Sequence, residues 1–228
     1  MYLSIIIPIF NEKDTILELL SKIKKVGLKK EYEVLMIDDG STDGTRHILE
    51  KLKNEKNYKI IFKEKNSGKG ESLKLGFKNA TGEYVIVQDA DLEYDPKDYL
   101  KLLEEISKHK KVVIYGSRFM GHYKDMSSLH YFGNQLLTFI TNLLYGVRLT
   151  DMETCYKLFP RQLIQNIKLK ASRFEFEPEV TAKIIKKGYK IIEVPISYTG
   201  RSHSEGKKIT WKDGFSAIFS LVKYRFID

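Results

Sequence analysis

Residues 84–106 read YVIVQDADLEYDPKDYLKLLEEI, and this stretch decides the fold. Tyr84 to Gln88 form an almost unbroken apolar run, as expected of a strand that is buried on both faces. The run ends at Asp89-Ala90-Asp91, and Pro96 then opens a helix that continues to Ile106. A buried strand, a short loop and a helix in this order form the repeating unit of a parallel sheet.

The same alternation of strand and helix signals runs through the first half of the chain. Four more apolar runs are predicted to be strands: Ser4 to Phe10, Glu33 to Ile37, Tyr58 to Phe62 and Val112 to Tyr115. Helices are predicted between them, and Asn11 is expected to cap the first helix. The sequence therefore predicts an α/β fold with a mostly parallel sheet flanked by helices on both faces.

The second half of the chain is less regular. It is predicted to contain helices over 132–145, 178–187 and 210–226, and strands over 152–159 and 190–198. Because Pro195 has no backbone N–H to donate, the last of these strands is expected at an edge of the sheet.

Composition narrows the class of protein. The chain has 228 residues, of which 42% are hydrophobic, so a folded core is expected and disorder is not. A single cysteine, Cys155, excludes an internal disulfide and fits a reducing compartment. No run reaches the roughly 18 apolar residues of a membrane-spanning helix, and no signal peptide is expected.

The net charge of +9 is unevenly placed along the chain. Residues 180–228 contain ten Lys or Arg residues but four Asp or Glu residues. A basic segment of this kind fits an anionic partner, such as phosphate, nucleic acid or anionic lipid. A lysine-rich solvated surface is the alternative interpretation.

Polar clusters follow three of the predicted strands, at Asn11-Glu12, Asp38-Asp39 and Asp89-Ala90-Asp91. The carboxyl ends of parallel strands meet at one edge of a sheet, where ligands bind. Asp89 and Asp91 repel each other unless a cation lies between them, and Mg²⁺ and Mn²⁺ prefer such oxygen ligands. Glu93 would supply a third oxygen. The alternative is an Asp-rich turn that caps the next helix.

Other polar residues allow two interpretations each. Asp39 is expected to accept hydrogen bonds from a base or a ribose, while Ser41 and Thr42 are expected to cap a helix. Asn66 to Gly70 form a glycine-bracketed turn with a lysine, which either approaches a phosphate or is a plain loop without Walker spacing. The three glutamates in 175–179 either orient an acceptor or face solvent.

Eight short motifs occur in order along nearly the whole chain, and together they are far more specific than any one alone. They are SIIIPIFNE at 4–12, DDGSTD at 38–43, NSGKG at 66–70, QDADLE at 88–93, GSR at 116–118, TDMETCYK at 150–157, FEFE at 174–177 and EVPI at 193–196. This series resembles the inverting family-two glycosyltransferases, in particular the dolichol-phosphate mannose synthase-like group.

The resemblance implies a single GT-A domain over residues 1–228, with a Rossmann-like sheet. Its nucleotide-sugar-binding half would be 1–116 and its acceptor-binding half 117–228, which would include an acceptor-site hairpin and amphipathic helices. In that family, a set of matching residues binds the nucleotide-sugar: Pro8, Phe10, Glu12, Ile37, Asp39, Asp89, Ala90, Asp91 and Lys208.

The resemblance also implies a metal site and an acceptor site. The residues matching Asp89, Asp91 and Glu93 hold Mg²⁺ or Mn²⁺, although the family often has Gln where this chain has Glu93. The acceptor phosphate would be bound by Arg118, Arg201 and Lys207. The catalytic residues would then be Asp91, Arg118 and Arg201.

The implied reaction moves a hexose from a donor of the GDP-mannose or UDP-glucose type to a polyprenyl or dolichyl phosphate. An ionised phosphate needs no strong catalytic base, but it needs a cationic pocket. Three alternatives stay open: the same fold with a glycan or protein acceptor and a carboxylate base, a nucleotidyltransferase that releases pyrophosphate, and a basic nucleic-acid or membrane-binding module without turnover.

The expected location is cytoplasmic, and the protein would be peripheral on the cytoplasmic face of a membrane. The helices predicted over 132–145 and 210–226 carry apolar faces of the kind that lie on a bilayer, with packing on the sheet as the alternative. A separate membrane-anchoring protein is another possible partner, whereas nucleic acid is not an expected one.

Overall fold

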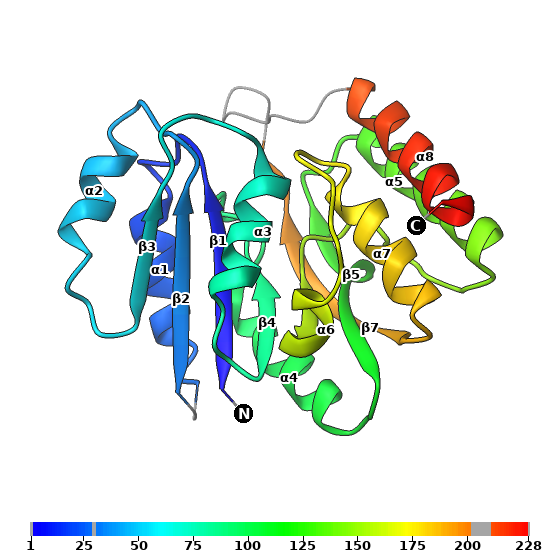
Figure 1. Cartoon of the computed structure of the whole chain (residues 1–228), viewed down its shortest axis with the longest axis horizontal. Coiled ribbons are helices and arrows are strands. Elements are labelled where there is room, and N and C mark those ends of the chain that lie inside the picture. Colours follow the sequence, from blue (N-terminus) through cyan, green and yellow to red (C-terminus); the bar gives the residue numbers. More distant parts are fainter. Residues whose placement is uncertain (1, 29–30, 202–210, 228) are drawn as a thin grey trace.

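The computed structural model describes residues 2–28, 31–201 and 211–227, and it contains a seven-stranded sheet of order β3-β2-β1-β4-β6-β5-β7 (Figure 1). Among the described strands, β6 alone runs antiparallel to its neighbours. The prediction of a mostly parallel sheet is thereby confirmed. The strands are β1 (Leu3–Ile9), β2 (Tyr32–Asp38), β3 (Tyr58–Phe62), β4 (Tyr84–Val87), β5 (Val112–Lys124), β6 (Lys157–Pro160) and β7 (Lys190–Thr199).

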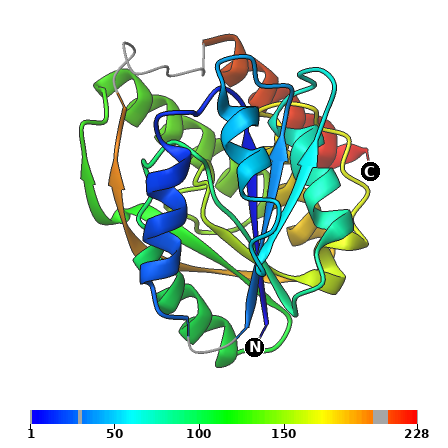
Figure 2. The ribbon, with the colours of Figure 1, turned by 90° about the vertical axis from the view of Figure 1, so that its left-hand side faces the viewer.

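Helices cover both faces of this sheet, with α1 and α4 on one face and α3, α6 and α7 on the other (Figures 1 and 2). Helices α5 and α8 lie farther out, beside α7. The helices are α1 (Ile16–Lys25), α2 (Thr45–Lys51), α3 (Lys69–Asn79), the 3₁₀ turn η1 (Pro96–Asp98), α4 (Tyr99–Ser107), α5 (Ser128–Tyr145), α6 (Arg161–Gln165), α7 (Phe176–Lys186) and α8 (Trp211–Phe226).

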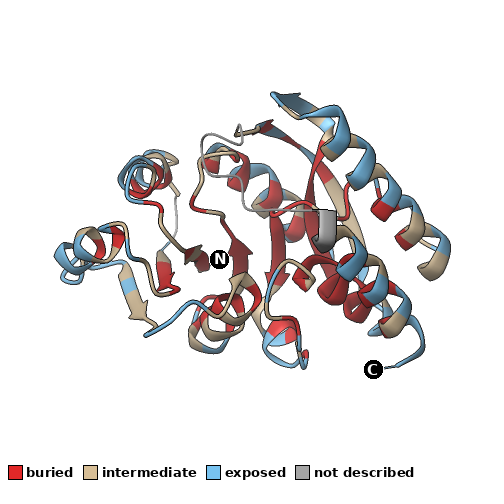
Figure 3. Ribbon diagram, turned by 90° about the horizontal axis from the view of Figure 1, so that it is seen from above, coloured by how far each residue is buried: buried red, intermediate tan, exposed pale blue. Residues whose placement is uncertain are grey.

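The core lies between these layers and is built from the apolar runs seen in the sequence. Viewed from above, the central strands are mostly buried and the outward sides of the helices are exposed (Figure 3). Ile5, Ile6 and Ile7 of β1 are fully buried, because β1 has a strand on each side and helices on each face. β7 is at the edge of the sheet, as Pro195 predicted.

Two local predictions were wrong. Asn11 does not cap α1, which begins at Ile16; Asn11 has φ 55° and its side-chain oxygen accepts the N–H of Thr42. Ser41 and Thr42 do not cap α2, which begins at Thr45 after Gly44, and the hydroxyl of Ser41 accepts the N–H of Asn11. These side chains satisfy the backbone of the neighbouring loop instead, a choice that depends on tertiary structure.

The loop before α3 and the first turn of α3, which contains Gly70, pack closely against the loop at 171–172. A Cβ atom on Gly70 would lie 2.5 Å from the carbonyl oxygen of Ala171, which belongs to the backbone and cannot rotate away. We expect Gly70→Ala to lower the free energy of unfolding by about 1–3 kcal/mol.

Urea denaturation would measure this effect. Gly133→Ala is the matched control, because a Cβ there meets nothing within 4 Å and Ala favours the α5 helix. Equal stability of Gly70→Ala and the wild type would show that the two loops are not held together in solution.

Candidate active site

The polar residues that follow β1, β2 and β4 lie at one edge of the sheet, at the top of Figure 1. The strands are parallel, and Ile9 at the end of β1 is paired with Asp38 at the end of β2. Glu12, Asp39, Asp89 and Asp91 therefore follow the same ends of neighbouring strands. The predicted convergence of acidic clusters is confirmed by this arrangement.

Arg201 joins the end of β7 to the carboxylates of this edge. Its two terminal nitrogens lie 3.1 and 3.2 Å from the carboxylate oxygens of Glu12, and Nη2 lies 3.4 Å from Asp91. Its Nε atom is buried and has no hydrogen-bond partner among the described residues. Arg201 therefore brings positive charge to the acidic cluster.

Lys69 is a second cation at this edge, and it is the lysine of the glycine-bracketed turn at 66–70. Its ammonium lies 2.9 Å from Asp89 and 3.0 Å from Glu177, which is in the first turn of α7. Burial alone would lower the pKa of Lys69, but the charges of Asp89 and Glu177 outweigh burial and raise this pKa well above its usual value. The glycine-bracketed lysine at 68–70 was the signal in the sequence.

Asp91 is held in an environment that disfavours its charged form. Desolvation, together with the charges of Asp89 and Glu93, raises the pKa of Asp91 to about 7, although Arg201 opposes the shift. A carboxyl with this pKa gains from a nearby divalent cation. The raised pKa of Asp91 therefore fits a metal site at Asp89 and Asp91, where a cation would offset the carboxylate charges.

We expect the affinity for Mn²⁺ to rise about tenfold between pH 6 and pH 8, because a proton competes with the metal below the pKa of Asp91. Titration of the nucleotide-free protein with Mn²⁺, followed by calorimetry, measures this change. Asp91→Asn removes the titrating group and should flatten the profile. An unchanged affinity across this range in the wild type would rule out Asp91 as a ligand.

Glu93 has partners of its own in this structure. One carboxylate oxygen accepts the phenol hydrogen of Tyr198 at 2.8 Å, and the other accepts the backbone N–H of Arg201 at 2.7 Å. Within residues 2–28, 31–201 and 211–227, no three His, Cys, Asp or Glu side chains form a metal-binding group. Glu93 as a third metal ligand therefore stays a prediction.

The carboxylate of Asp39 is turned into the loop at 66–70. It pairs with the ammonium of Lys63 and accepts the backbone N–H groups of Ser67 at 3.1 Å and Gly68 at 2.8 Å. Asp39 thus positions the loop that carries Lys69, and its contact with a nucleotide stays a prediction.

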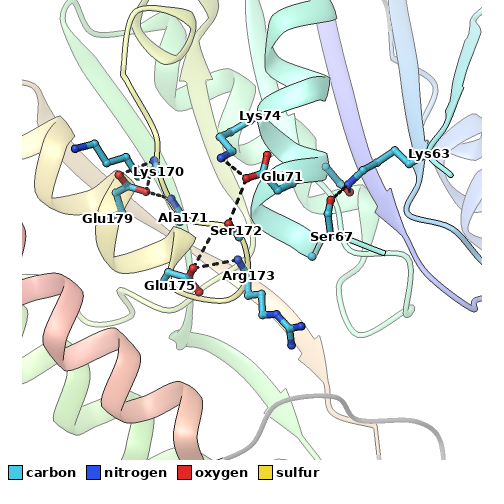
Figure 4. A network of polar contacts seen from close by, with 12 residues as sticks. Lys63, Ser67, Glu71, Lys74, Lys170, Ala171, Ser172, Arg173, Glu175 and Glu179 are labelled. Carbon is cyan, nitrogen blue, oxygen red and sulfur yellow. Dashed lines mark hydrogen bonds and ion pairs between the residues drawn. The ribbon is translucent and has the colours of Figure 1, made fainter. Parts of the chain in front are cut away.

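A network of polar contacts continues from this loop to the start of α7 (Figure 4). Ser172 donates to Glu71 at 3.2 Å, and Glu175 accepts the N–H groups of Ser172 and Arg173. Glu179 is buried and accepts the N–H groups at 170 and 171. Of the two interpretations of Glu177 and Glu179, the solvent-facing one does not hold, because both side chains are buried with internal partners.

Arg118 is buried beside Asp151, which lies in the loop before β6. Nε and Nη2 each lie 2.7 Å from the carboxylate of Asp151, and the backbone N–H of Arg118 donates to it at 2.9 Å. Burial would lower the pKa of Arg118, but the charge of Asp151 raises it well above its usual value. One edge of the guanidinium is therefore occupied, and binding of an acceptor phosphate by Arg118 stays a prediction.

The remaining predicted site residues differ in accessibility. Ile37 and Ala90 are buried, whereas Pro8 and Phe10 are partly exposed at the end of β1. Lys207 and Lys208 lie outside the described residues. The strand expected over 152–159 begins at Lys157, because the backbone N–H groups of Met152 and Cys155 donate to the side chains of Thr138 and Tyr94 and not to a neighbouring strand.

Known proteins resemble this chain in sequence. The family model of glycosyl transferase family 2 matches residues 4–168. An uncharacterised protein of Methanocaldococcus jannaschii is 32% identical over 227 residues, which cover 96% of this chain and 90% of the relative. The undecaprenyl-phosphate 4-deoxy-4-formamido-L-arabinose transferase of Pseudomonas fluorescens is 26% identical over 208 residues, covering 90% of this chain and 59% of that longer protein.

A solved structure resembles the fold. Glucosyl-3-phosphoglycerate synthase of Mycobacterium tuberculosis, in complex with Mn²⁺, UDP-glucose and phosphoglyceric acid, has a TM-score of 0.72 at 17% identity. The match covers 99% of this chain and 80% of that chain. At this identity the likeness concerns the fold alone. With its mostly parallel sheet, its acidic edge and its match to the family model, this chain belongs to glycosyl transferase family 2 and has the GT-A fold.

Proposed function

We propose that the protein transfers a hexose from a nucleoside-diphosphate sugar to a polyprenyl phosphate, with Mg²⁺ or Mn²⁺ bound at Asp89 and Asp91. The observation that carries the proposal is the acidic edge of the sheet, where Lys69 pairs with Asp89 and Arg201 pairs with Asp91. Support for the acceptor comes from the Pseudomonas fluorescens relative, whose name specifies undecaprenyl phosphate. Support for a metal and a UDP-sugar comes from the contents of the Mycobacterium tuberculosis complex.

The chemistry requires charge at two places. An oxygen of the acceptor phosphate forms a bond to the anomeric carbon, and the bond from that carbon to the donor diphosphate breaks with inversion. The leaving diphosphate keeps the bonding electrons, and a divalent ion held by Asp89 and Asp91 would stabilise its charge. Lys69 and Arg201 supply further positive charge at this edge, and Arg118, Arg201 and Lys207 are proposed to receive the acceptor phosphate.

A donor and acceptor screen tests the proposal. The protein is incubated with Mg²⁺ or Mn²⁺, a short polyprenyl phosphate, and GDP-mannose, UDP-glucose or UDP-N-acetylglucosamine, and products are identified by mass. We expect one donor to give nucleoside diphosphate and a glycolipid only when the acceptor carries its phosphate. Release of pyrophosphate would point to a nucleotidyltransferase, and transfer to the matching polyprenol would refute the phosphate acceptor.

A hydroxyl-bearing acceptor, such as a glycan, is the second candidate, and one residue favours it. The Oε1 atom of Glu153 is buried and has no hydrogen-bond partner among the described residues. Desolvation and the charge of Glu177 raise the pKa of Glu153 to about 8, against the opposing charges of Lys157 and Arg118. A carboxyl with such a pKa suits a general base near neutral pH.

Glu153→Gln separates the two acceptors. If the acceptor is a phosphate, the variant should keep its rate within about threefold, because an ionised phosphate needs no base. If the acceptor is a hydroxyl, kcat of the variant should fall at least about a hundredfold, and its pH profile should no longer rise near pH 8. Steady-state rates between pH 6 and pH 9 measure the difference.

A further inference from the structure

Helix α5 exposes a stripe of large apolar side chains to solvent. Its five residues are between 53% and 80% exposed and recur at intervals of three and four: Leu129, Phe132, Leu136, Phe139 and Leu143. The buried residues of α5, Leu137, Thr138 and Thr141, lie on the opposite side of the helix. α5 is therefore apolar on its outward side as well, whereas a surface helix usually turns charged and polar residues outward.

Helix α8 repeats this arrangement beside it. Four of its residues are between 42% and 78% exposed: Phe215, Phe219, Val222 and Phe226. Ala217 and Leu221 point the other way and join Leu137 of α5 in a small core. The phenol of Tyr145 donates to the carbonyl of Leu221 at 2.7 Å, and Figure 1 shows the two helices side by side.

These nine side chains, the exposed stripes of α5 and α8, form what we call the α5–α8 face. Large apolar side chains exposed in this number on two neighbouring helices mark an interaction site. None of the helices in the described part of the chain is long and apolar enough to cross a membrane.

We propose that the α5–α8 face lies on the surface of an anionic lipid bilayer. This inference rests on the proposed lipid-phosphate acceptor and names the surface from which that acceptor would be taken. Helices that are apolar on one side and basic at their borders bind such surfaces. α5 contains no Asp, Glu, Lys or Arg between Ser128 and Tyr145. Arg148, Lys223 and Arg225 follow at or near the C-terminal ends of the two helices.

Aromatic side chains mark the other end of α5. The rings of Phe119, Tyr123, Tyr131 and Phe132 are in mutual contact, with centroids 5.3–6.1 Å apart. A tyrosine joins an apolar ring to a polar hydroxyl at its tip, and such side chains are enriched at membrane–water boundaries.

Charge favours a bilayer over a second copy of the chain. A two-fold contact would place the same surface on both subunits, so basic residues at the ends of α5 and α8 would approach basic residues of the other copy. Anionic headgroups instead neutralise Arg148, Lys223 and Arg225. The overall charge of +9 acts in the same direction.

In the sequence, the two helices of this face follow the arginines proposed to bind the acceptor phosphate. Arg118 lies in β5, which leads into α5 at Ser128, and Arg201 is followed by α8, which begins at Trp211. A lipid whose phosphate lay near these arginines would have its hydrocarbon chain in the bilayer that the face contacts.

Vesicle binding tests this inference without any acceptor or donor. The probes are vesicles of phosphatidylcholine with about 30% phosphatidylglycerol, and bound protein is measured by co-sedimentation. We expect the double variant Phe139→Glu with Phe219→Glu to bind the vesicles at least about tenfold more weakly. It loses two apolar side chains and gains two negative charges, which the anionic lipid repels. Leu17→Glu with Leu100→Glu is the matched control, since these residues are 52% and 49% exposed on α1 and α4.

Failure of the wild type to bind these vesicles, or equal binding by the Phe139/Phe219 variant, would overturn the inference. A wild type that is dimeric by light scattering, with a monomeric Phe139/Phe219 variant, would assign the face to a second copy instead. Activity on a short, water-soluble polyprenyl phosphate is measured separately. Its absence in a wild type that binds vesicles would count against the proposed reaction and leave the membrane face standing.

Discussion

Asp91→Asn is expected to lower the rate of sugar transfer by on the order of a thousandfold, the usual effect of removing a group that stabilises charge in the transition state. Asp91 lies in the loop that follows β4, and its carboxylate is one of the two oxygen groups proposed to hold the divalent ion. Asn keeps the shape of the side chain but removes its charge. The rate would be measured with the donor found in the screen, and metal binding by calorimetry.

The same substitution should leave the protein folded and slightly more stable above pH 7. The pKa of Asp91 is about 7 in the folded state and 3.8 as a model value, so the folded protein binds more protons between these pH values. The stability of the wild type therefore falls as the pH rises toward 7. The Asp91→Asn variant does not show this loss, because its side chain does not titrate. Thermal unfolding at pH 5 and pH 8 measures it.

Asp14→Asn is the control for both experiments, because Asp14 is exposed on the loop before α1. Activity of Asp91→Asn within tenfold of the wild type would refute the metal site. A loss of activity that came with unfolding would be traced to the fold by the same thermal measurement.

Asp151→Asn is expected to cause the largest loss of stability, about 3–5 kcal/mol in the free energy of unfolding. Asp151 is fully buried and accepts three hydrogen bonds from Arg118, which is itself buried. Removing the carboxylate charge leaves the guanidinium without a counterion in the interior. Urea denaturation at neutral pH measures the effect.

Two comparisons make this result interpretable. Glu18→Gln breaks the exposed pair with Lys22 and should change stability little, because solvent screens that pair. Arg118→Met combined with Asp151→Leu removes both charges and should recover much of the loss. A loss below about 1 kcal/mol for Asp151→Asn alone would mean that Arg118 finds another partner.

The sequence was most informative where local pattern and burial agree. β1 and β4 are central strands covered by helices on both faces, so their residues form continuous apolar runs that the sequence displays. Pro195 identified β7 as an edge strand because the missing N–H is a local property. Helix starts were less predictable, since Asn11 and Ser41 can bind either their own helix or a neighbouring loop.

The sequence by itself therefore determined the fold class, the family and the strand ends at which the acidic residues lie, because these depend on residues close together in the chain. The tertiary structure alone decided the ion-pair partners: Arg201 reaches Glu12 from 189 residues away, and Lys69 lies between Asp89 and Glu177. It also decided that the stripe of α5 faces outward. Apolar periodicity specifies that a helix has an apolar side, but what covers that side depends on how the whole chain packs.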